Sequence, residues 1–124
     1  MPLDVQKQGQ HESDSLLAES KLFCASCGHW ITHHDWKTSV KEAHEHTVFN
    51  PAGIVFTIGC FLDAPGCWAT GQPSDQFTWF PTYKWRLALC EGCGKQLGWL
   101  FTGGNTLPVF YGLILNKLTD KPDH

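Results

Sequence analysis

The sequence predicts a single, mainly β domain built from antiparallel strands with little helix. A chain of 124 residues has the size of one ordinary domain, and its 42% hydrophobic content is enough to form one core. Between residues 21 and 116, glycine and proline divide the chain into short segments that are rich in β-branched and aromatic residues. Such segments are typical of strands.

The two ends of the chain differ in composition from its middle. Residues 1–20 are mostly polar without a sustained period, and we expect them to form a flexible tail. Residues 117–124 are expected to form a second tail, so the folded domain should span residues 21–116. The first residues lack the basic-then-apolar order of a secretory signal, and no apolar run approaches the ~18–20 residues of a membrane span. These features predict a cytoplasmic protein that does not enter a membrane.

Four segments of the middle region have the composition of strands, and in two of them large residues recur at every second position. In chain order, the segments are 53–62, 83–89, 96–102 and 107–115. The recurring positions predicted to share a face are Tyr83, Trp85, Leu87 and Leu89 in the second segment, and Leu97, Trp99 and Phe101 in the third. Residues 37–46 fit either a strand or a short helix, and the sequence does not decide between them.

Four cysteines occur as two C-x-x-C pairs, each followed directly by glycine. In a reducing compartment, cysteines in this pattern indicate a metal site rather than a disulfide framework. Two thiolates from one tight turn can reach a tetrahedral ion, and two such turns complete the four ligands of a structural zinc site. The sequence therefore predicts one structural Zn²⁺ held by Cys24, Cys27, Cys90 and Cys93. A redox-active or merely buried set of cysteines is the alternative.

The remaining cysteines and the histidines have no comparable pattern. Cys60 and Cys67 are expected to be buried thiols. His44 and His46 could hold a second metal, but solvated surface histidines are the simpler interpretation.

The charge balance argues against polyanionic partners. Nine Lys and Arg face twelve Asp and Glu, which gives a net charge of −3. The chain therefore lacks the electrostatic signature of a protein that binds nucleic acid or an anionic membrane.

Six tryptophans in so short a chain call for an explanation. Trp85 lies five residues before Cys90 and Trp99 six residues after Cys93, so a hairpin turned by the second cysteine pair places both indoles at similar heights on neighbouring strands. Trp79 precedes this hairpin in an irregular segment rich in Gly and Pro. The pattern fits an aromatic cage for a small ligand. Ordinary core packing is the alternative, although buried indoles each need a partner for their N–H.

One ordered set of motifs is specific. The run SDQFTWFPTYKW at 74–85, then C-x-x-C, then GWLFT at 98–102, resembles the thalidomide-binding (CULT) domain of cereblon. With the first cysteine pair upstream and FNPAG at 49–53 between them, the resemblance covers residues 21–116. It implies two antiparallel sheets set at a steep angle and pinned at one edge by zinc, which is a β-tent-like fold.

The resemblance also implies a pocket that binds glutarimide or a related cyclic imide between three tryptophan walls. Thalidomide-type compounds, uracil- or uridine-like molecules and protein C-termini that carry a cyclised imide are the ligands it suggests. The implied binding residues are Asn50 at the rim, backbone groups around Phe77, Thr78 and Trp79, the walls Trp79, Trp85 and Trp99, and Phe101 at the back.

Two departures from cereblon limit what the resemblance implies. The chain has no room for the additional N-terminal domain or for the segment that docks on a ubiquitin-ligase adaptor, so we expect a stand-alone, bacterial-type form without that partner. Phe77 stands where animal cereblon has a histidine, which removes any side-chain hydrogen bond at that position.

The same residues argue against two classes of enzyme. A methionine sulfoxide reductase of the B type would need a nucleophilic cysteine after the second pair, yet Cys93 is the last cysteine of the chain. A zinc deaminase would need proline before the second pair, where this chain has Leu89. We therefore expect no enzymatic activity. An aromatic cage for a methylated ammonium group, with Asp75 supplying negative charge, remains the main alternative.

Overall fold

The computed structural model describes residues 20–122, which fold into two antiparallel sheets and two short 3₁₀ helices. One sheet has three strands in the order β2-β1-β9, and the other has six in the order β3-β4-β8-β7-β6-β5. The mainly β fold with two antiparallel sheets is as predicted. The elements in chain order are β1 (Lys21–Cys24), β2 (Trp30–His33), η1 (His34–Trp36), β3 (Glu45–Phe49), β4 (Val55–Phe61), β5 (Cys67–Ser74), β6 (Lys84–Cys90), β7 (Gln96–Thr102), β8 (Val109–Ile114), η2 (Leu115–Lys117) and β9 (Leu118–Thr119).

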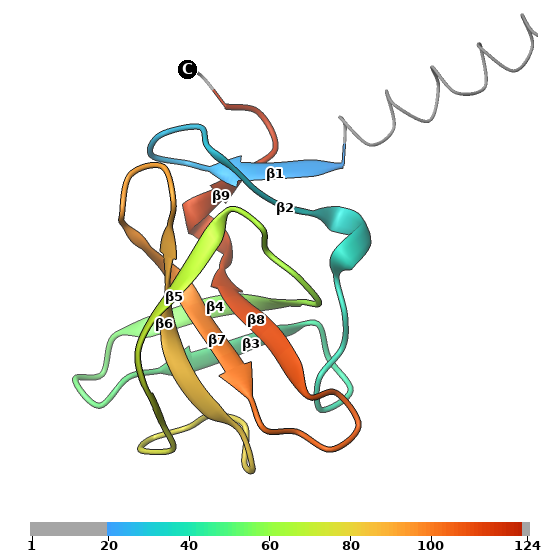
Figure 1. Ribbon diagram of the computed structural model, residues 1–124, viewed down its shortest axis with the longest axis vertical. Helices are drawn as coiled ribbons and strands as arrows, with labels where there is room; N and C mark the ends of the chain where they lie inside the picture. The colour runs from blue at the N-terminus through green and yellow to red at the C-terminus, as the bar shows by residue number, and fades with distance from the viewer. Residues whose placement is uncertain (1–19, 123–124) are drawn as a thin grey trace, which may run out of the picture.

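The two sheets meet at one end of the molecule. In Figure 1 the strands β1 and β2 run across the top, and β6, β7 and β8 descend steeply from them. The turn between β6 and β7 reaches up beside the turn between β1 and β2 (Figure 1). Each of these turns carries one of the cysteine pairs, so the cysteines lie where the sheets join.

The larger sheet buries side chains on both faces, because successive residues of a strand point to opposite sides. On β6, Ala88 and Cys90 pack on one face, whereas Trp85 and Leu87 pack on the other. The first face packs against the smaller sheet in an intersheet cluster that consists of Leu22, Cys24, Ile31, Phe61, Ala64, Cys67, Ala88, Cys90, Leu97 and Leu113. The second face supports an aromatic cluster that consists of Val40, Val48, Ile58, Cys60, Phe80, Trp99, Phe101, Phe110 and Ile114.

Each of the four predicted strand segments overlaps a strand, namely β4, β6, β7 and β8 in turn, although β6 ends one residue later than expected, at Cys90. The second cysteine pair turns the hairpin between β6 and β7, as predicted. The two indoles of this hairpin are diagonal neighbours rather than directly opposite, since Trp85 pairs with Phe101 and Trp99 pairs with Leu87. All four side chains therefore share one face of the sheet.

The expectation that Leu97 shares a face with Trp99 and Phe101 is wrong. The register between β6 and β7 shifts by one residue between Ala88 and Leu89. An extra residue in one strand changes which face the following side chains occupy. As a result Leu97 packs in the intersheet cluster, while Trp99 and Phe101 belong to the aromatic cluster.

Residues 37–46 form neither of the expected elements over most of their length. Val40 and Ala43 make an isolated antiparallel bridge around a turn, and β3 begins only at Glu45. Lys41 and Glu42 occupy that turn with φ values of 53° and 69°, a left-handed conformation that is uncommon for residues other than glycine.

The C-terminal end of the chain differs from expectation. Residues 1–19 of the expected N-terminal tail lie outside the described residues. At the other end, Leu118 and Thr119 of the expected tail form β9, which pairs with Cys24 and Phe23 of β1. The folded domain therefore extends past residue 116, because this short segment completes the smaller sheet.

Candidate functional site

The two cysteine pairs converge on one point between the sheets. Their four Sγ atoms all lie within 4.8 Å of one another. The Sγ atoms of Cys24 and Cys93 are 3.8 Å apart, and those of Cys27 and Cys90 are 3.6 Å apart. A tetrahedral ion with bonds of about 2.3 Å to sulfur requires sulfur–sulfur distances of roughly 3.8 Å. The cluster therefore fits a metal ion with four thiolate ligands.

The two cysteine turns have the same backbone structure. In each, the glycine after the pair has a positive φ, 80° at Gly28 and 79° at Gly94. The N–H of each glycine donates to the carbonyl of the first cysteine of its pair, at 2.8 Å in both turns. This left-handed position is the physical reason for glycine after each pair. The sequence signal and the local geometry agree here.

Proton binding should compete with metal binding at this cluster. Burial raises the pKa of Cys90 to about 12, whereas a backbone hydrogen bond from Lys95 lowers the pKa of the exposed Cys93. A metal holds thiolates, so its binding must release the proton of Cys90. One hydrogen bond favours the thiolate form, because the Gly92 N–H donates to Cys90 Sγ at 3.3 Å and stabilises negative charge on that sulfur.

Within residues 20–122, the four cysteines are the only group of three or more side chains that could hold a metal ion. The two histidines considered for a second site are engaged with backbone carbonyls instead. His46 donates from Nε2 to Val40 O at 2.9 Å and to Ala43 O at 3.0 Å, and His44 Nδ1 lies 3.1 Å from Thr38 O.

The leftover cysteines are both buried, as expected. Burial raises the pKa of Cys60 and of Cys67 to about 12, so both remain protonated near neutral pH. Burial therefore disfavours the thiolate form of both residues near neutral pH.

A cavity of about 430 Å³ opens on the aromatic face of the β6–β7 hairpin. Its floor comes from these two strands, and its sides come from the segment after β5 and from the turn between β3 and β4. This volume lies within the range of roughly 300–1,000 Å³ that small-molecule sites occupy. The lining residues are Asn50, Pro51, Phe56, Ser74, Gln76, Phe77, Trp79, Trp85, Leu87, Gln96 and Trp99.

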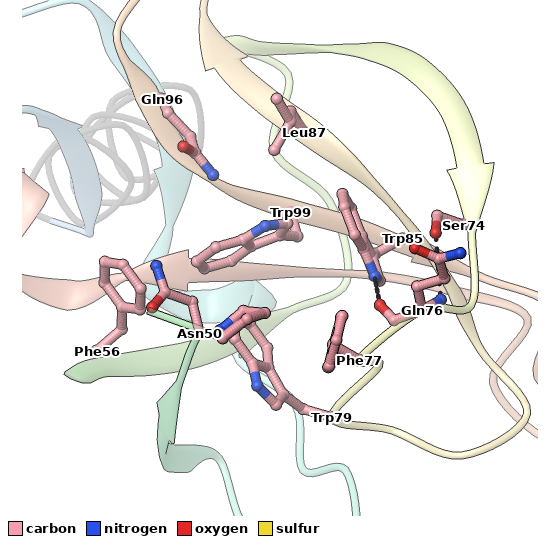
Figure 2. Close-up of a pocket in the computed structure, with 11 residues that line it drawn as sticks. Asn50, Phe56, Ser74, Gln76, Phe77, Trp79, Trp85, Leu87, Gln96 and Trp99 are labelled. Carbon is pink, nitrogen blue, oxygen red and sulfur yellow. Dashed lines mark hydrogen bonds between the residues drawn. The ribbon is translucent and has the colours of Figure 1, made fainter. Parts of the chain in front are cut away.

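Three indoles surround this cavity without stacking on one another (Figure 2). The rings of Trp79 and Trp99 meet edge to face, with centroids 4.7 Å apart and an interplanar angle of 89°. Backbone carbonyls fix two of the rings, because Trp79 Nε1 donates to Phe49 O at 2.9 Å and Trp85 Nε1 donates to Gln76 O at 2.8 Å. Hydrogen bonds within the protein thus orient two of the three walls.

The segment 75–79 forms one side of the cavity and leaves backbone groups open. Phe77 has a φ of 54°, and its side chain is 73% exposed beside the mouth of the cavity. Among the described residues, neither the N–H nor the carbonyl of Phe77 has a hydrogen-bond partner, and neither has the N–H of Trp79. A polar ligand with donors and acceptors in one plane could meet these groups.

The remaining residues implied by the resemblance lie in different places around the cavity. Asn50 lines it, and its Oδ1 accepts the N–H groups of Ala52 and Ile54 at 3.0 and 2.9 Å. Thr78 lines a neighbouring hollow instead, and its hydroxyl donates to Phe80 O at 3.2 Å. Phe101 is fully buried behind the cavity, where it packs in the aromatic cluster rather than forming part of the lining.

Several lining residues were not singled out from the sequence. Leu87 had a signal, because it was placed on the same strand face as Trp85. The others come from the ends of β5 and β7, from the loop after β5 and from the β3–β4 hairpin, whose contact with Trp99 the sequence does not encode locally. The residues missed are Pro51, Phe56, Ser74, Gln76, Leu87 and Gln96.

The wall formed by Trp79 is supported from behind by the turn at residues 40–43. Lys41 Nζ lies 3.5 Å from Trp79 O and 5.9 Å from the centroid of the Phe80 ring. His46 packs edge-on against the same Phe80 ring, at 5.0 Å between centroids, while it holds the turn through its two hydrogen bonds. The turn at residues 40–43 thus contacts the chain at Trp79 and Phe80.

Comparisons with known proteins find similarity to cereblon of several Drosophila species. The chain is 32% identical over 101 residues to cereblon of Drosophila erecta and 30% identical over 104 residues to cereblon of Drosophila persimilis, which covers 77% and 79% of this chain but 17% of each relative. A shorter match to cereblon of Drosophila melanogaster reaches 43% over 47 residues, or 36% of this chain and 8% of the relative. No family model matches the chain. Most of this chain is therefore related to one segment of cereblon, and it spans about a sixth of the length of these relatives.

No helix in residues 20–122 is long and apolar enough to cross a membrane.

Proposed function

We propose that this chain is a zinc-stabilised, non-enzymatic binding domain for a cyclic imide, such as the glutarimide ring of thalidomide-type compounds. The ligand would lie between Trp79, Trp85 and Trp99. The observation that carries this proposal is the cavity of about 430 Å³ with these three indoles in its lining, two of them held by hydrogen bonds to backbone carbonyls. The relation to cereblon supports a binding domain of the same kind.

The chemistry of an imide complements this lining. The ring offers one N–H donor between two carbonyl acceptors, and its methylene edge is apolar. The open backbone groups of Phe77 and Trp79 supply matching acceptors and donors. The lining contains no Asp, Glu, Lys, Arg or His, so it favours a neutral ligand over a charged one.

The expected affinity follows from the surface that such a ligand would bury. About 150 Å² of apolar ligand surface at ~25 cal/mol/Å² contributes roughly 4 kcal/mol. Each hydrogen bond adds about 1 kcal/mol, and the loss of translational and rotational freedom opposes association. These terms together predict binding in the micromolar range.

The metal of the proposal is one Zn²⁺ per chain, because four thiolates within tetrahedral distance suit this ion. All four positions would be filled by protein ligands, which leaves none for water and makes the role structural. Elemental analysis of the purified chain should find about one zinc per molecule. Two metals per chain, or none, would contradict this assignment.

The main rival is a cage for a methylated ammonium group. Such cages commonly combine indoles with a carboxylate that balances the cation. Asp75, the carboxylate that the sequence suggested for this role, does not line the cavity. A cage for methylated ammonium would therefore lack its carboxylate, and we expect such cations to bind only weakly.

The natural ligand of the proposed site carries an imide or an equivalent group. Uracil- or uridine-like molecules and protein C-termini with a cyclised imide both carry an N–H between two carbonyls, and we propose them as candidates. Recruitment of a ubiquitin-ligase adaptor is not part of the proposal, because the similarity covers only one segment of cereblon. A reducing cytoplasm suits the free thiols that the metal site requires.

Fluorescence titration tests imide binding directly. Because the indoles line the site, thalidomide should quench the tryptophan fluorescence saturably, with a dissociation constant in the micromolar range. Thalidomide methylated on its glutarimide nitrogen is the matched control, since it keeps the ring but loses the donor. It should bind at least tenfold more weakly, and so should trimethyl-lysine. If trimethyl-lysine bound more tightly than thalidomide, the imide assignment would be wrong.

A further inference from the structure

We propose that Cys67 and Cys90 form a cross-strand disulfide under oxidising conditions, in exchange for the metal that Cys90 otherwise binds. The two residues face each other at the junction of β5 and β6, where Cys67 pairs with Cys90 in the strand register. Cys67 is the fifth cysteine around this end of the sheet and is not one of the four clustered ligands. The proposal concerns the metal site and does not depend on the nature of the ligand in the aromatic cavity.

The hydrogen bonding identifies the type of this strand pair. Glu91 N–H donates to Gly66 O at 2.9 Å, so the residues just outside the pair are bonded to each other. In an antiparallel ladder, that pattern makes Cys67 and Cys90 a non-hydrogen-bonded pair. Such pairs have Cα atoms about 4.5 Å apart and the closer side chains of the two pair types. This separation lies within the range of roughly 4.4–6.8 Å that disulfides span.

Both side chains also lie in the same environment. Cys67 and Cys90 belong to the intersheet cluster, so both thiols project from the same face of the sheet toward the smaller sheet. Cys60 has no such partner, because it packs in the aromatic cluster on the opposite face. Of the two leftover cysteines, only Cys67 is therefore placed to react with a metal ligand.

The metal and this disulfide exclude each other. Cys90 Sγ lies 3.6 Å from Cys27 Sγ, which is its position as a ligand. A bond from Cys90 to Cys67 would withdraw one of the four thiolates from the ion, and three ligands from a closed site hold a metal far less tightly. Oxidation would then release the metal, and reduction would restore the site.

A peroxide supplies the oxidising equivalents through the exposed end of the cluster. Cys93 is the exposed ligand, so hydrogen peroxide first converts its thiol to a sulfenic acid and releases water. The Cys90 thiol attacks that sulfur, which forms a Cys90–Cys93 bond and releases a second water. The Cys67 thiol then attacks the Cys90 sulfur, and Cys93 leaves as a thiol that takes up the proton. In sum, two thiols and one peroxide give one disulfide and two water molecules.

Disulfide mapping of the full chain tests this proposal. The zinc-loaded protein is treated with hydrogen peroxide while a chromogenic zinc indicator follows metal release. Free thiols are then alkylated, and the digested peptides are analysed by mass spectrometry. We expect a Cys67–Cys90 disulfide in most of the molecules that have lost metal, together with alkylated Cys60. Dithiothreitol and zinc should return the protein to its loaded state.

Matched variants separate this pairing from general oxidation. Cys60→Ser should leave the Cys67–Cys90 disulfide unchanged, whereas Cys67→Ser should abolish it and shift Cys90 to a partner within the cluster. The proposal is wrong if the wild-type chain loses its metal with Cys67 still alkylated and Cys90 joined to Cys27 or Cys93. Because that result is read from the wild-type protein, it does not depend on the folding of any variant.

Discussion

Removing the metal is expected to unfold this domain. The cysteine cluster ties the smaller sheet, through Cys24 at the end of β1, to the larger sheet, through Cys90 at the end of β6. Both of these residues are almost fully buried in the intersheet cluster. Structural zinc supplies roughly 10–16 kcal/mol in small zinc-binding peptides, whereas a whole domain is stable by only about 5–15 kcal/mol. The proposed metal would therefore contribute an amount comparable to the whole net stability of the domain.

The substitution Cys93→Ser isolates this contribution. Cys93 is exposed, so its replacement removes a metal ligand without opening a hole in the core. We expect the variant to lose zinc and to melt about 20 °C or more below the wild-type chain, which corresponds to a loss of about 5 kcal/mol. Near-ultraviolet circular dichroism, which reports the packing of the tryptophans, is the readout. A strong chelator should have the same effect on the wild-type protein.

Ser26 provides the control for this experiment. It lies in the first cysteine turn, and its side chain is exposed like that of Cys93, but it is not part of the cluster. Ser26→Ala should keep its zinc and should melt within a few degrees of the wild-type chain. If Cys93→Ser kept the wild-type melting temperature, and chelation left the spectrum unchanged, the metal would not hold the two sheets together.

The second large effect is expected at the cavity. Trp85→Ala should lower the affinity for thalidomide about 100-fold, or about 3 kcal/mol, because it removes one complete wall of the proposed site. Trp85 is only partly buried, and the main anchor of its ring is the hydrogen bond from Nε1 to Gln76 O. The fold should therefore survive the change. Isothermal titration calorimetry measures the affinity, and the melting temperature verifies the fold.

Trp68 offers a matched comparison in the same chain. It lies on β5, next to β6, and its indole is 48% exposed without lining the cavity. Trp68→Ala removes the same chemical group and should change the affinity by less than a factor of two. An affinity for Trp85→Ala that stayed within threefold of the wild-type value would place the ligand elsewhere on the molecule.

The parts of the molecule that could be predicted from sequence are those that local chemistry determines. Two cysteines at a fixed spacing followed by glycine encode a turn with a positive φ, and both turns have that geometry. The strands β4, β6, β7 and β8 are long and apolar enough to stand out on their own. Because the second cysteine pair turns a hairpin, the similar distances of Trp85 and Trp99 from that turn were enough to predict that the two residues lie close together.

The features that sequence reasoning missed depend on contacts between distant segments. The strands β1 and β2 have four residues each, and β9 has two, so their signals are too short to distinguish from loops. Leu97 lies on the other face because of a bulge, and no single residue in the sequence indicates that bulge. The cavity lining likewise includes Phe56 and Pro51 only because the β3–β4 hairpin packs across β7.

The sequence did not decide whether the aromatic residues pack as a core or line a binding cavity, and the geometry assigns residues to each role. Phe101 and Phe110 stack at 4.9 Å in the interior, which is ordinary core packing. The indoles of Trp79 and Trp99 instead meet edge to face beside an open cavity. Aromatic residues on one strand face thus serve as core at one end and as cavity wall at the other, and alternation alone cannot separate these roles.

A crystal structure of the chain grown with glutarimide tests the central claim most directly. We expect density for one imide ring enclosed by Trp79, Trp85 and Trp99, with its N–H and carbonyls within hydrogen-bond distance of the backbone at Phe77 and Trp79. The indoles should keep the positions that their bonds to Phe49 O and Gln76 O define. A cavity that stays empty at saturating glutarimide, or indoles collapsed onto one another with no space between them, would contradict the account.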